Sequence, residues 1–422
     1  MEVEEGIDRS AGEGPPLDRS SFRLDDVLWV MHCAEGPMPR PASAAVGEFL
    51  DKEVRPWRIG WLEDFVGIPW RVKTEGARLL GAAAEDLSLT STTTSGLAVV
   101  AQGLPWRVGD EVLSPLGEFP ANAWPWLAQR HRGVELREVP LWEGHRSGAD
   151  AWTSLPPTAA ADPETRLLEA LGPRTRILTV SWVRFQDGLR LDLERLAAGC
   201  AQRGVILVVD GIQGAGTLPS SLDGLEGICA FATGGHKGLL APQGLGLLWT
   251  SRDFREGLCP PGGWLSVEEA TNFDRPSTDL HRTWAQDGSK LEAGVPNLVG
   301  CVALAESLAL LNGAGISRLE AHILRLQGRL IAGLGDMAGW RGEAERLYDL
   351  WQGGRLGSLL SIHHGDRGPA AFQEILRDGL GRGIYASVRE GFLRIALHGW
   401  HTAEDVDRLL GWLASCADRK RR

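Results

Sequence analysis

Apolar and polar positions along the first 290 residues predict strands and helices in turn. The run "VILVVD" (205–210) is apolar without interruption, which is typical of a strand that helices cover on both faces. The segment before it, "DLERLAAGCAQRG", repeats its apolar residues at helical spacing and stops at Gly204. Because such elements keep alternating, the pattern predicts an α/β fold with a mostly parallel sheet. Further strands are expected at 87–90, 110–115, 134–141 and 176–183.

After about residue 290 the pattern changes to long helices and short strands. Two helical stretches cover 298–315 and 316–336, and apolar strands lie near 358–364 and 392–398. A last amphipathic helix closes the chain. We therefore expect three regions: a flexible N-terminal tail (1–25), a large cofactor-binding α/β domain (26–290) and a smaller C-terminal α+β domain (291–422).

Composition and charge narrow the class of partner. The 422 residues are 43% hydrophobic and carry a formal net charge of −11, which disfavours binding to nucleic acid or to an anionic membrane. No apolar run is long enough to predict a membrane span, and the acidic N-terminus does not resemble an export signal. The six cysteines are scattered without a C-x-x-C pair, so we expect reduced thiols, no metal site and a cytoplasmic protein.

Candidate chemistry centres on "FATGGHKGLLAPQG" (231–244). It places His236 and Lys237 in a glycine-rich loop directly after an apolar run, a setting that suits a lysine bonded to a carbonyl better than a surface lysine. Asp210 ends the strand 205–210, and open α/β sheets bind ligands at the carboxyl ends of their strands. The "GIQGAG" that follows has the order G-x-x-G-x-G, so it does not match the dinucleotide fingerprint.

Lys237, Asp210 and Gln213 together suit pyridoxal phosphate. The aldehyde of this cofactor needs a lysine amine for a Schiff base, and its pyridine nitrogen needs a carboxylate to stay protonated. Its phenolic oxygen can accept from the Gln213 amide, and its phosphate is expected at the helix N-terminus that begins within "TSTTTSG" (90–96). Each residue alone also fits a strand end, a turn cap or a surface charge. Their order and spacing favour the cofactor.

The segments "VVDGIQGAG" and "GGHKGLLAPQGLGLLW" resemble the class V aminotransferase family, which includes cysteine desulfurases, kynureninase and isopenicillin N epimerase. The segments "GEFPANAWPW", "LEAGVPN" and "FLRIALHGWHTAEDVDRLL" extend the resemblance over about 30–415. It implies a fold-type I enzyme with a seven-stranded type of sheet, Lys237 as the Schiff-base residue and Arg394 on the substrate carboxylate. The cofactor contacts that it implies are Thr93, Thr94, Phe119, Asp210, Gln213, Thr233, His236 and Lys237.

Several positions depart from the family pattern. Val295 replaces a threonine that reaches the phosphate across the dimer, and Thr233 is expected to stand in for a serine that "GGHK" lacks. Trp182 replaces a polar residue after "ILTVS", so it joins His32 among the candidate substrate contacts. The loop "GIYASVREG" (383–391) carries no cysteine, which disfavours a cysteine desulfurase.

The resemblance implies a homodimeric enzyme that binds an amino acid or amine as an external aldimine and acts at Cα. Our main hypothesis is an aminotransferase or epimerase in which Lys237 moves the Cα proton. A lyase that breaks a Cα–Cβ or Cβ–S bond stays open, because it would use the same carbanion. A binding protein without activity is disfavoured by the intact Lys237 and Asp210.

Overall fold

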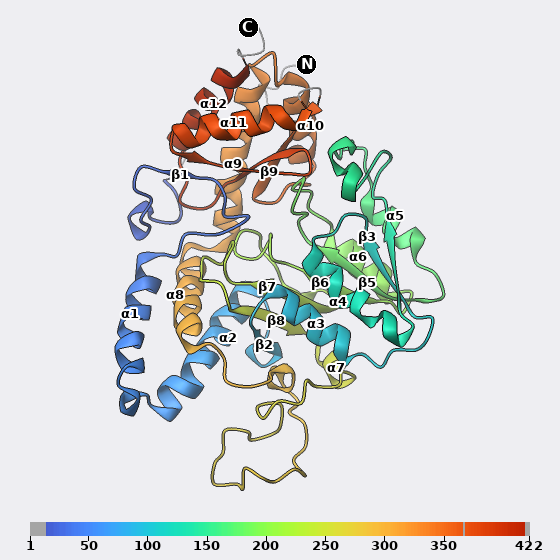
Figure 1. Ribbon diagram of the computed structural model, residues 1–422, viewed down its shortest axis with the longest axis vertical. Helices are drawn as coiled ribbons and strands as arrows, with labels where there is room; N and C mark the ends of the chain where they lie inside the picture. Colours follow the sequence, from blue (N-terminus) through green and yellow to red (C-terminus); the bar gives the residue numbers. More distant parts are fainter. Residues whose placement is uncertain (1–13, 366–367, 418–422) are drawn as a thin grey trace.

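A seven-stranded sheet forms the centre of the computed structural model, which describes residues 14–365 and 368–417 (Figure 1). Only β8 runs antiparallel to its neighbours, β2 and β7, and the other adjacent strands in this sheet are parallel. The prediction of a mostly parallel α/β sheet is therefore confirmed. In spatial order the strands are β2 (Leu87–Thr90), β8 (Gly246–Thr250), β7 (Ile228–Gly234), β6 (Ile206–Asp210), β5 (Thr175–Ser181), β3 (Glu111–Pro115) and β4 (Glu135–Val139).

Helices cover both faces of this sheet because successive strand residues point to opposite sides. In β6, Val208 belongs to an apolar cluster with residues of α3, whereas Val209 belongs to the cluster that includes residues of α2, α6 and α8. Both valines are fully buried, which is why the sequence of this strand is apolar throughout. The helices of this part are α1 (Arg40–Glu53), α2 (Gly67–Leu80), α3 (Thr93–Gly103), α4 (Trp124–Leu127), α5 (Pro163–Ala170), α6 (Leu193–Ala201), α7 (Arg252–Glu256) and α8 (Leu298–Ala314).

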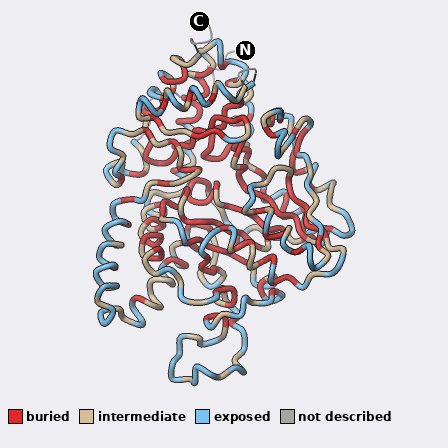
Figure 2. Tube along the Cα trace, in the orientation of Figure 1, coloured by how far each residue is buried: buried red, intermediate tan, exposed pale blue. Residues whose placement is uncertain are grey.

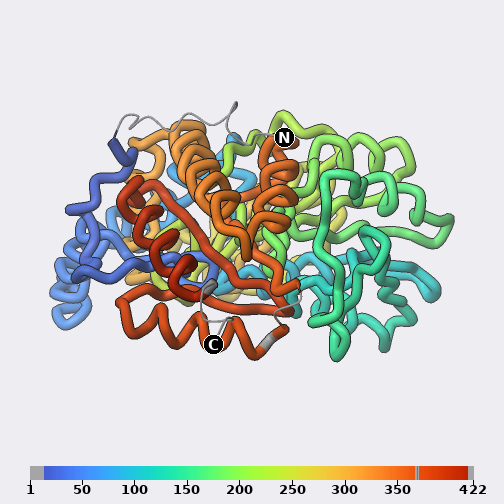
Figure 3. The backbone as a smooth tube through the Cα atoms, turned by 90° about the horizontal axis from the view of Figure 1, so that it is seen from above, coloured from blue at the N-terminus to red at the C-terminus, as the bar shows by residue number. Residues whose placement is uncertain are grey.

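A second, antiparallel sheet lies in the C-terminal part, in the order β11 (Ser387–Arg389), β12 (Phe392–Ala396) and β9 (Leu359–His363). Figure 3, seen from above, shows the orange and red C-terminal segments lying across the rest of the chain. Although α8 follows residue 290, it packs against α1 and α2 of the large sheet's layer. The remaining helices are α9 (Ile316–Gly335), α10 (Arg341–Gln352), α11 (Gly368–Gly381) and α12 (Ala403–Ala417).

Residues 14–25, the described part of the predicted N-terminal tail, include residues that pack against the C-terminal part. Residues 1–13 lie outside the described residues, but Leu17 and Phe22 are buried and the Leu17 N–H donates to the carbonyl of Gly399. Strand β1 (Leu28–Trp29) then pairs in parallel with β10 (Ile384–Tyr385) of the C-terminal part. We call residues 28–36 the N-terminal strap, because they join the C-terminal part to the large sheet.

Burial follows the layers (Figure 2). The central sheet is red throughout its middle, whereas α1 and the long loop below the sheet are largely pale blue. Among the described residues, no single helix is long and apolar enough to span a bilayer. Only α8 and α9 counted as one segment have that length and apolar composition, and they are bent by 74° relative to each other.

Buried histidines fill the junction between the strap, α9 and the C-terminal sheet. His398 Nε2 donates to the carbonyl of Gly238 (3.1 Å), and the Gly399 N–H donates to His398 Nδ1 (2.8 Å). His401 Nε2 donates to the carbonyl of Trp29 (3.0 Å). Burial lowers the pKa of His398 to about 3 and that of His401 to about 4, so both rings are neutral at pH 7.

We expect the free energy of unfolding to fall as the pH drops below about 6.5. The folded protein keeps His398 neutral, whereas the unfolded chain takes up a proton near its ordinary pKa of about 6.5. Above that pH, protonation of His398 does not lower the free energy of unfolding. Below it, His398 lowers this free energy by up to about 1.4 kcal/mol per pH unit. Urea titrations at pH 7.5 and pH 5.5 measure this loss. His398→Gln should reduce the difference in unfolding free energy between the two pH values. The matched change at the exposed His131, His131→Gln, should not. An equal difference in the parent and both variants would contradict the assignment.

Candidate functional site

Lys237 lies in a tight turn that directly follows β7. We call residues 234–241 the lysine turn. Leu240 within it has φ 59°, a left-handed conformation that costs a leucine about 1–2 kcal/mol. Its N–H donates to the carbonyl of Lys237 (3.1 Å), and its carbonyl accepts from Ser307 Oγ of α8 (2.9 Å). The turn is therefore held in a strained shape by bonds from inside and from a neighbouring helix.

Glycines let two segments pack directly on the lysine turn. A Cβ on Gly36 of the strap would lie 2.2 Å from the carbonyl oxygen of Lys237. A Cβ on Gly216, which has φ 85°, would lie 2.3 Å from the carbonyl oxygen of Gly238. Gly216, the last glycine of "GIQGAG", thus permits close backbone approach to the lysine turn.

The Lys237 amine is buried without a partner. The residue is 9% exposed, and its Nζ makes no hydrogen bond or ion pair with any residue that the structure describes. Burial lowers the pKa of Lys237, although the charge of Asp210 opposes the shift. Nζ lies 5.6 Å from the centre of the Phe119 ring. The site therefore favours a neutral, nucleophilic amine beside an aromatic face.

Asp210 is buried at the carboxyl end of β6. Its Oδ1 accepts from the Ile212 N–H (3.0 Å), and no other described residue donates to the carboxylate. Burial raises the pKa of Asp210 to about 6; the Ile212 N–H and the charge of Lys237 oppose the shift, and the charge of Glu118 adds to it. The carboxylate therefore lacks the positive partner that would stabilise it at neutral pH.

Glu118 is a neighbour that the sequence did not single out. Its carboxylate accepts from the Ser181 N–H (3.0 Å), from the Ser181 hydroxyl and from Asn122 Nδ2 (3.3 Å). These bonds fix the segment that carries Phe119 onto the end of β5. The Phe119 ring meets Phe185 edge to face at 5.1 Å. The only sequence signal for Glu118 was its place beside Phe119.

The start of α3 offers donors for an anion. Thr92 caps the helix by accepting from the Ser95 N–H (3.0 Å), while Ser95 Oγ accepts from the Thr92 N–H (2.9 Å). Thr93 is buried, and its hydroxyl has no hydrogen-bond partner among the described residues. Thr94 is exposed. An unpartnered hydroxyl next to the free N–H groups of a helix N-terminus fits a phosphate group.

Arg394 is buried on β12 and bridges the two parts of the molecule. Its Nε donates to Ser387 Oγ (3.0 Å), and its Nη1 donates to the carbonyl of Phe185 (2.8 Å). The charge of Arg394 adds to the lowering of the Lys237 pKa that burial causes. The remaining guanidinium N–H groups can bind a carboxylate.

Of the other predicted residues, Gln213 and His236 contact the strap, and His32 lies beside His398. Gln213 Nε2 donates to the carbonyl of Cys33 in the strap (3.0 Å), and His236, which is part of the lysine turn, accepts from the Gly36 N–H of the strap through its carbonyl (2.7 Å). His32 is 2% exposed; its Nε2 lies 3.1 Å from Ser358 Oγ, and its ring meets His398 edge to face.

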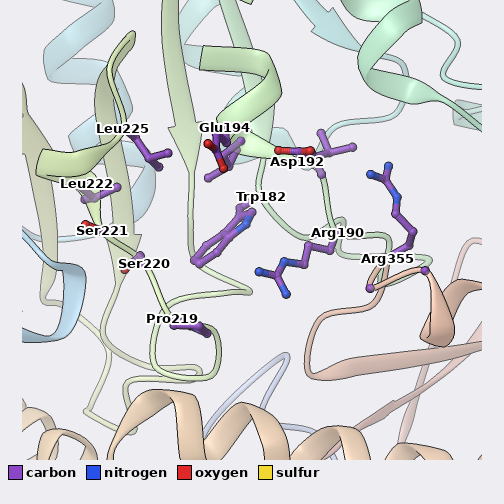
Figure 4. Close-up of a pocket in the computed structure, with 14 residues that line it drawn as sticks. Trp182, Arg190, Asp192, Glu194, Pro219, Ser220, Ser221, Leu222, Leu225 and Arg355 are labelled. Carbon is purple, nitrogen blue, oxygen red and sulfur yellow. The ribbon is translucent and has the colours of Figure 1, made fainter. Parts of the chain in front are cut away.

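Thr233 and Trp182 lie on the opposite face of the sheet from Asp210. Asp210 pairs with Ala232, so Thr233 points to the other side of β7, where its hydroxyl donates to the carbonyl of Gly234. Trp182 meets Phe231 edge to face at 6.0 Å and lines a separate cavity of about 540 Å³ (Figure 4). The structure thus brings Lys237, Asp210, Phe119 and Arg394 together but leaves Trp182 and Thr233 apart from them.

Comparisons with known proteins bear on this arrangement. The profile described as aminotransferase class-V matches residues 64–409. The chain is 26% identical over 358 residues to a probable cysteine desulfurase of Methanothermobacter thermautotrophicus, which covers 79% of this chain and 80% of the relative. It is 29% identical over 342 residues to the isopenicillin N epimerase of Amycolatopsis lactamdurans, with 77% and 78% covered.

Solved structures show the same fold. A mutant of C-DES with glycine linked covalently to its PLP cofactor has a TM-score of 0.79 and 22% identity, covering 94% of this chain and 99% of that one. The cystine C–S lyase C-DES with cysteine persulfide has a TM-score of 0.76 and 22% identity, covering 91% and 96%.

We expect Lys237 to be the lysine that pyridoxal phosphate labels. Incubation with this aldehyde and reduction with borohydride should fix the label on the peptide that contains Lys237, because its amine is unpartnered and its pKa is lowered. Lys290 is a matched control: it is also buried with a lowered pKa, but its Nζ donates to two backbone carbonyls. Peptide mapping measures the label. A label instead on Lys290, or on the buried Lys73 that pairs with Glu292 (2.8 Å), would contradict the assignment.

Proposed function

The chain belongs to the class V aminotransferase family, and on this premise we propose that it moves the Cα proton of an α-amino acid, as an aminotransferase or epimerase does. Its cofactor is pyridoxal 5′-phosphate, as in the family and in the structural neighbours. The observation that carries the proposal is the buried Lys237 amine, which has no hydrogen bond or ion pair among the described residues and whose pKa responds to the charges of Asp210 and Arg394.

The residues of the site match the groups of the cofactor. Thr93 and the N–H groups at the start of α3 would bind the phosphate, since the Thr93 hydroxyl lacks a partner. Asp210 would hold the proton of the pyridine nitrogen, and that positive charge would be the partner its buried carboxylate lacks. Phe119 would cover one face of the ring and exclude water. When bound, the cofactor supplies an aldehyde for the amine and an acceptor for the electrons left at Cα.

Substrate handling would use two basic groups, Lys237 after β7 of the large sheet and Arg394 on β12 of the C-terminal sheet. The free N–H groups of Arg394 would bind the α-carboxylate, which fixes the position of Cα. The Lys237 amine would then take the Cα proton and return it, a role that suits an amine whose pKa burial has lowered. The hairpin of β11 and β12 carries Ser387 beside Arg394 and no cysteine, so no thiol from this hairpin is available for attack on a sulfur atom.

Asp210→Asn tests this function on two measurements. The neutral amide keeps the size of the side chain, so lysine labelling should persist while Cα–H exchange with deuterated water, followed by NMR, slows by orders of magnitude. The cofactor-free protein should gain about 1–3 kcal/mol of stability, because a buried carboxylate without a cation is removed. Exchange as fast as in the parent would contradict the role of Asp210.

Product analysis separates the possible outcomes. A keto acid or an inverted amino acid without cleavage supports the proposed function, whereas pyruvate or alanine together with a released fragment would replace it with a lyase activity. The same incubations with amino acids serve the product analysis and the measurement of Cα–H exchange.

We also propose that the protein is a homodimer. An aromatic patch formed by Trp61, Phe65, Trp264 and Phe273 is partly exposed, with Trp61 stacked on Phe65 at 4.1 Å and tilted against Phe273 at 4.6 Å. Its Trp264 lies against Gly294, next to the exposed Val295. Monomers rarely expose such clusters, so the patch supports a contact between two copies.

Trp61→Glu should lower the mass measured by light scattering from two chains to one at micromolar concentration, because a charge in an apolar contact is costly. Val108→Glu is the control, since Val108 is 89% exposed and lies outside the patch. A parent protein that is monomeric with cofactor bound, or a variant that stays dimeric, would contradict the assigned contact.

A further inference from the structure

Cys33 lies on the same face of the C-terminal sheet as Arg394. The residue is 2% exposed and forms a small apolar cluster with Leu359 and Ala396. Leu359 and Ala396 are paired across β9 and β12, and Ala396 is two residues from Arg394 on the same strand. Residues at that spacing share a face, so the Cys33 side chain covers the face from which Arg394 projects.

The strap also ties Cys33 to the lysine turn. The Cys33 carbonyl accepts from Gln213 Nε2 (3.0 Å), and three residues later the Gly36 N–H donates to the carbonyl of His236 (2.7 Å). A negative charge on Cys33 would act on both Lys237 and Arg394, so its side chain lies within electrostatic range of both. Cys33 is therefore linked to the lysine turn through the strap and to the face that carries Arg394 through Leu359 and Ala396.

Two polar groups lie on the elements that Cys33 and the strap contact and have no hydrogen-bond partner among the described residues. The Lys237 amine has none among the described residues, and neither does the hydroxyl of Ser361, which pairs in register with Arg394. Native proteins rarely bury polar groups unpaired, so these groups point to a ligand in this region.

Of the other described cysteines, Cys229 at the start of β7 and Cys416 at the end of α12 are half-buried. Cys200 and Cys301 are in the core, where burial raises their pKa to about 12, and Cys259 is exposed.

We propose that Cys33 contacts the amino-acid substrate beside its α-carbon and limits the size of the group that this carbon can carry. The inference rests on the proposed function, in which the amino end of the substrate meets the Lys237 region and its carboxylate meets Arg394. A single carbon separates these two ends of an α-amino acid, so a side chain near both Lys237 and Arg394 is beside that carbon. A thiol is small and weakly polar, and a larger side chain at this position would occupy the space of the substituent.

Alkylation of the holoenzyme tests this placement without a mutation. Iodoacetamide should modify Cys33 about tenfold more slowly when glycine, L-alanine or L-glutamate is present at saturation, as a bound ligand protects its site by mass action. Peptide mapping measures the rates, with Cys259 as the exposed control that the amino acid does not protect. A Cys33 that stays unmodified in every condition, as Cys200 and Cys301 should, would identify it as a core residue and overturn the proposal.

Variants test the size limit. Cys33→Val should weaken L-alanine binding about tenfold, and glycine binding less, because added methyl groups overpack a filled site by about 1–3 kcal/mol. Cys33→Ser and the control Cys259→Ser should bind both amino acids nearly as the parent does. The change in cofactor absorbance on titration gives each dissociation constant, and equal losses for glycine and L-alanine would overturn the size limit.

The two hypotheses fail in different ways. If none of the three amino acids changes the cofactor absorbance of the parent enzyme, the proposed function is wrong and this inference with it. If the absorbance changes but Cys33 is alkylated equally fast with and without the amino acid, only the role of Cys33 is wrong. If Cys33→Val does not fold, the protection experiment on the unmodified protein decides.

Discussion

The site depends on burying an amine and a carboxylate close together without joining them. Lys237 and Asp210 influence each other's pKa, yet the structure records no ion pair between them. Burial pushes both groups toward their neutral forms, and isolated buried charges are among the most costly groups in a folded protein. A cofactor with a positive ring nitrogen and an aldehyde would relieve both costs at once. Much of the affinity for such a cofactor would then come from relief of the cost of burying these two groups.

The surrounding backbone keeps these two groups apart. The lysine turn includes the left-handed Leu240 and is pressed by Gly36 and Gly216, where any side chain would collide with a carbonyl oxygen. Asp210 is held by the N–H of Ile212 and by its place at the end of a buried strand. Because the strain is distributed over contacts from the strap, from α8 and from the segment after β6, no single bond determines where the amine points.

The parts of the fold that local pattern controls could be predicted from the sequence. The unbroken apolar run of β6 marked a strand covered on both faces, and the residue that ends it proved to be the buried Asp210. The placement of Thr233 and Trp182 depends on which face of the sheet each side chain takes. Side chains alternate between the faces along a strand, so a shift of one residue reverses the face. Leu240 gave no signal, because leucine is not a turn-forming residue and its conformation is imposed by packing. The burial of Leu17 depends on Gly399, nearly the whole chain away, which no local pattern reveals.

The strap has a consequence for how the protein is made. Strand β1 pairs with β10, so the beginning of the chain finds its partner only after almost all of the chain has left the ribosome. Contacts of such large sequence separation form late and slow the final step of folding. Until then the large sheet can assemble, but the lysine turn lacks the cover that Gly36 provides. In a nascent or truncated chain, Lys237 would therefore remain uncovered. Only the full-length chain would cover it, because the strap near the beginning needs β10 near the end as its partner.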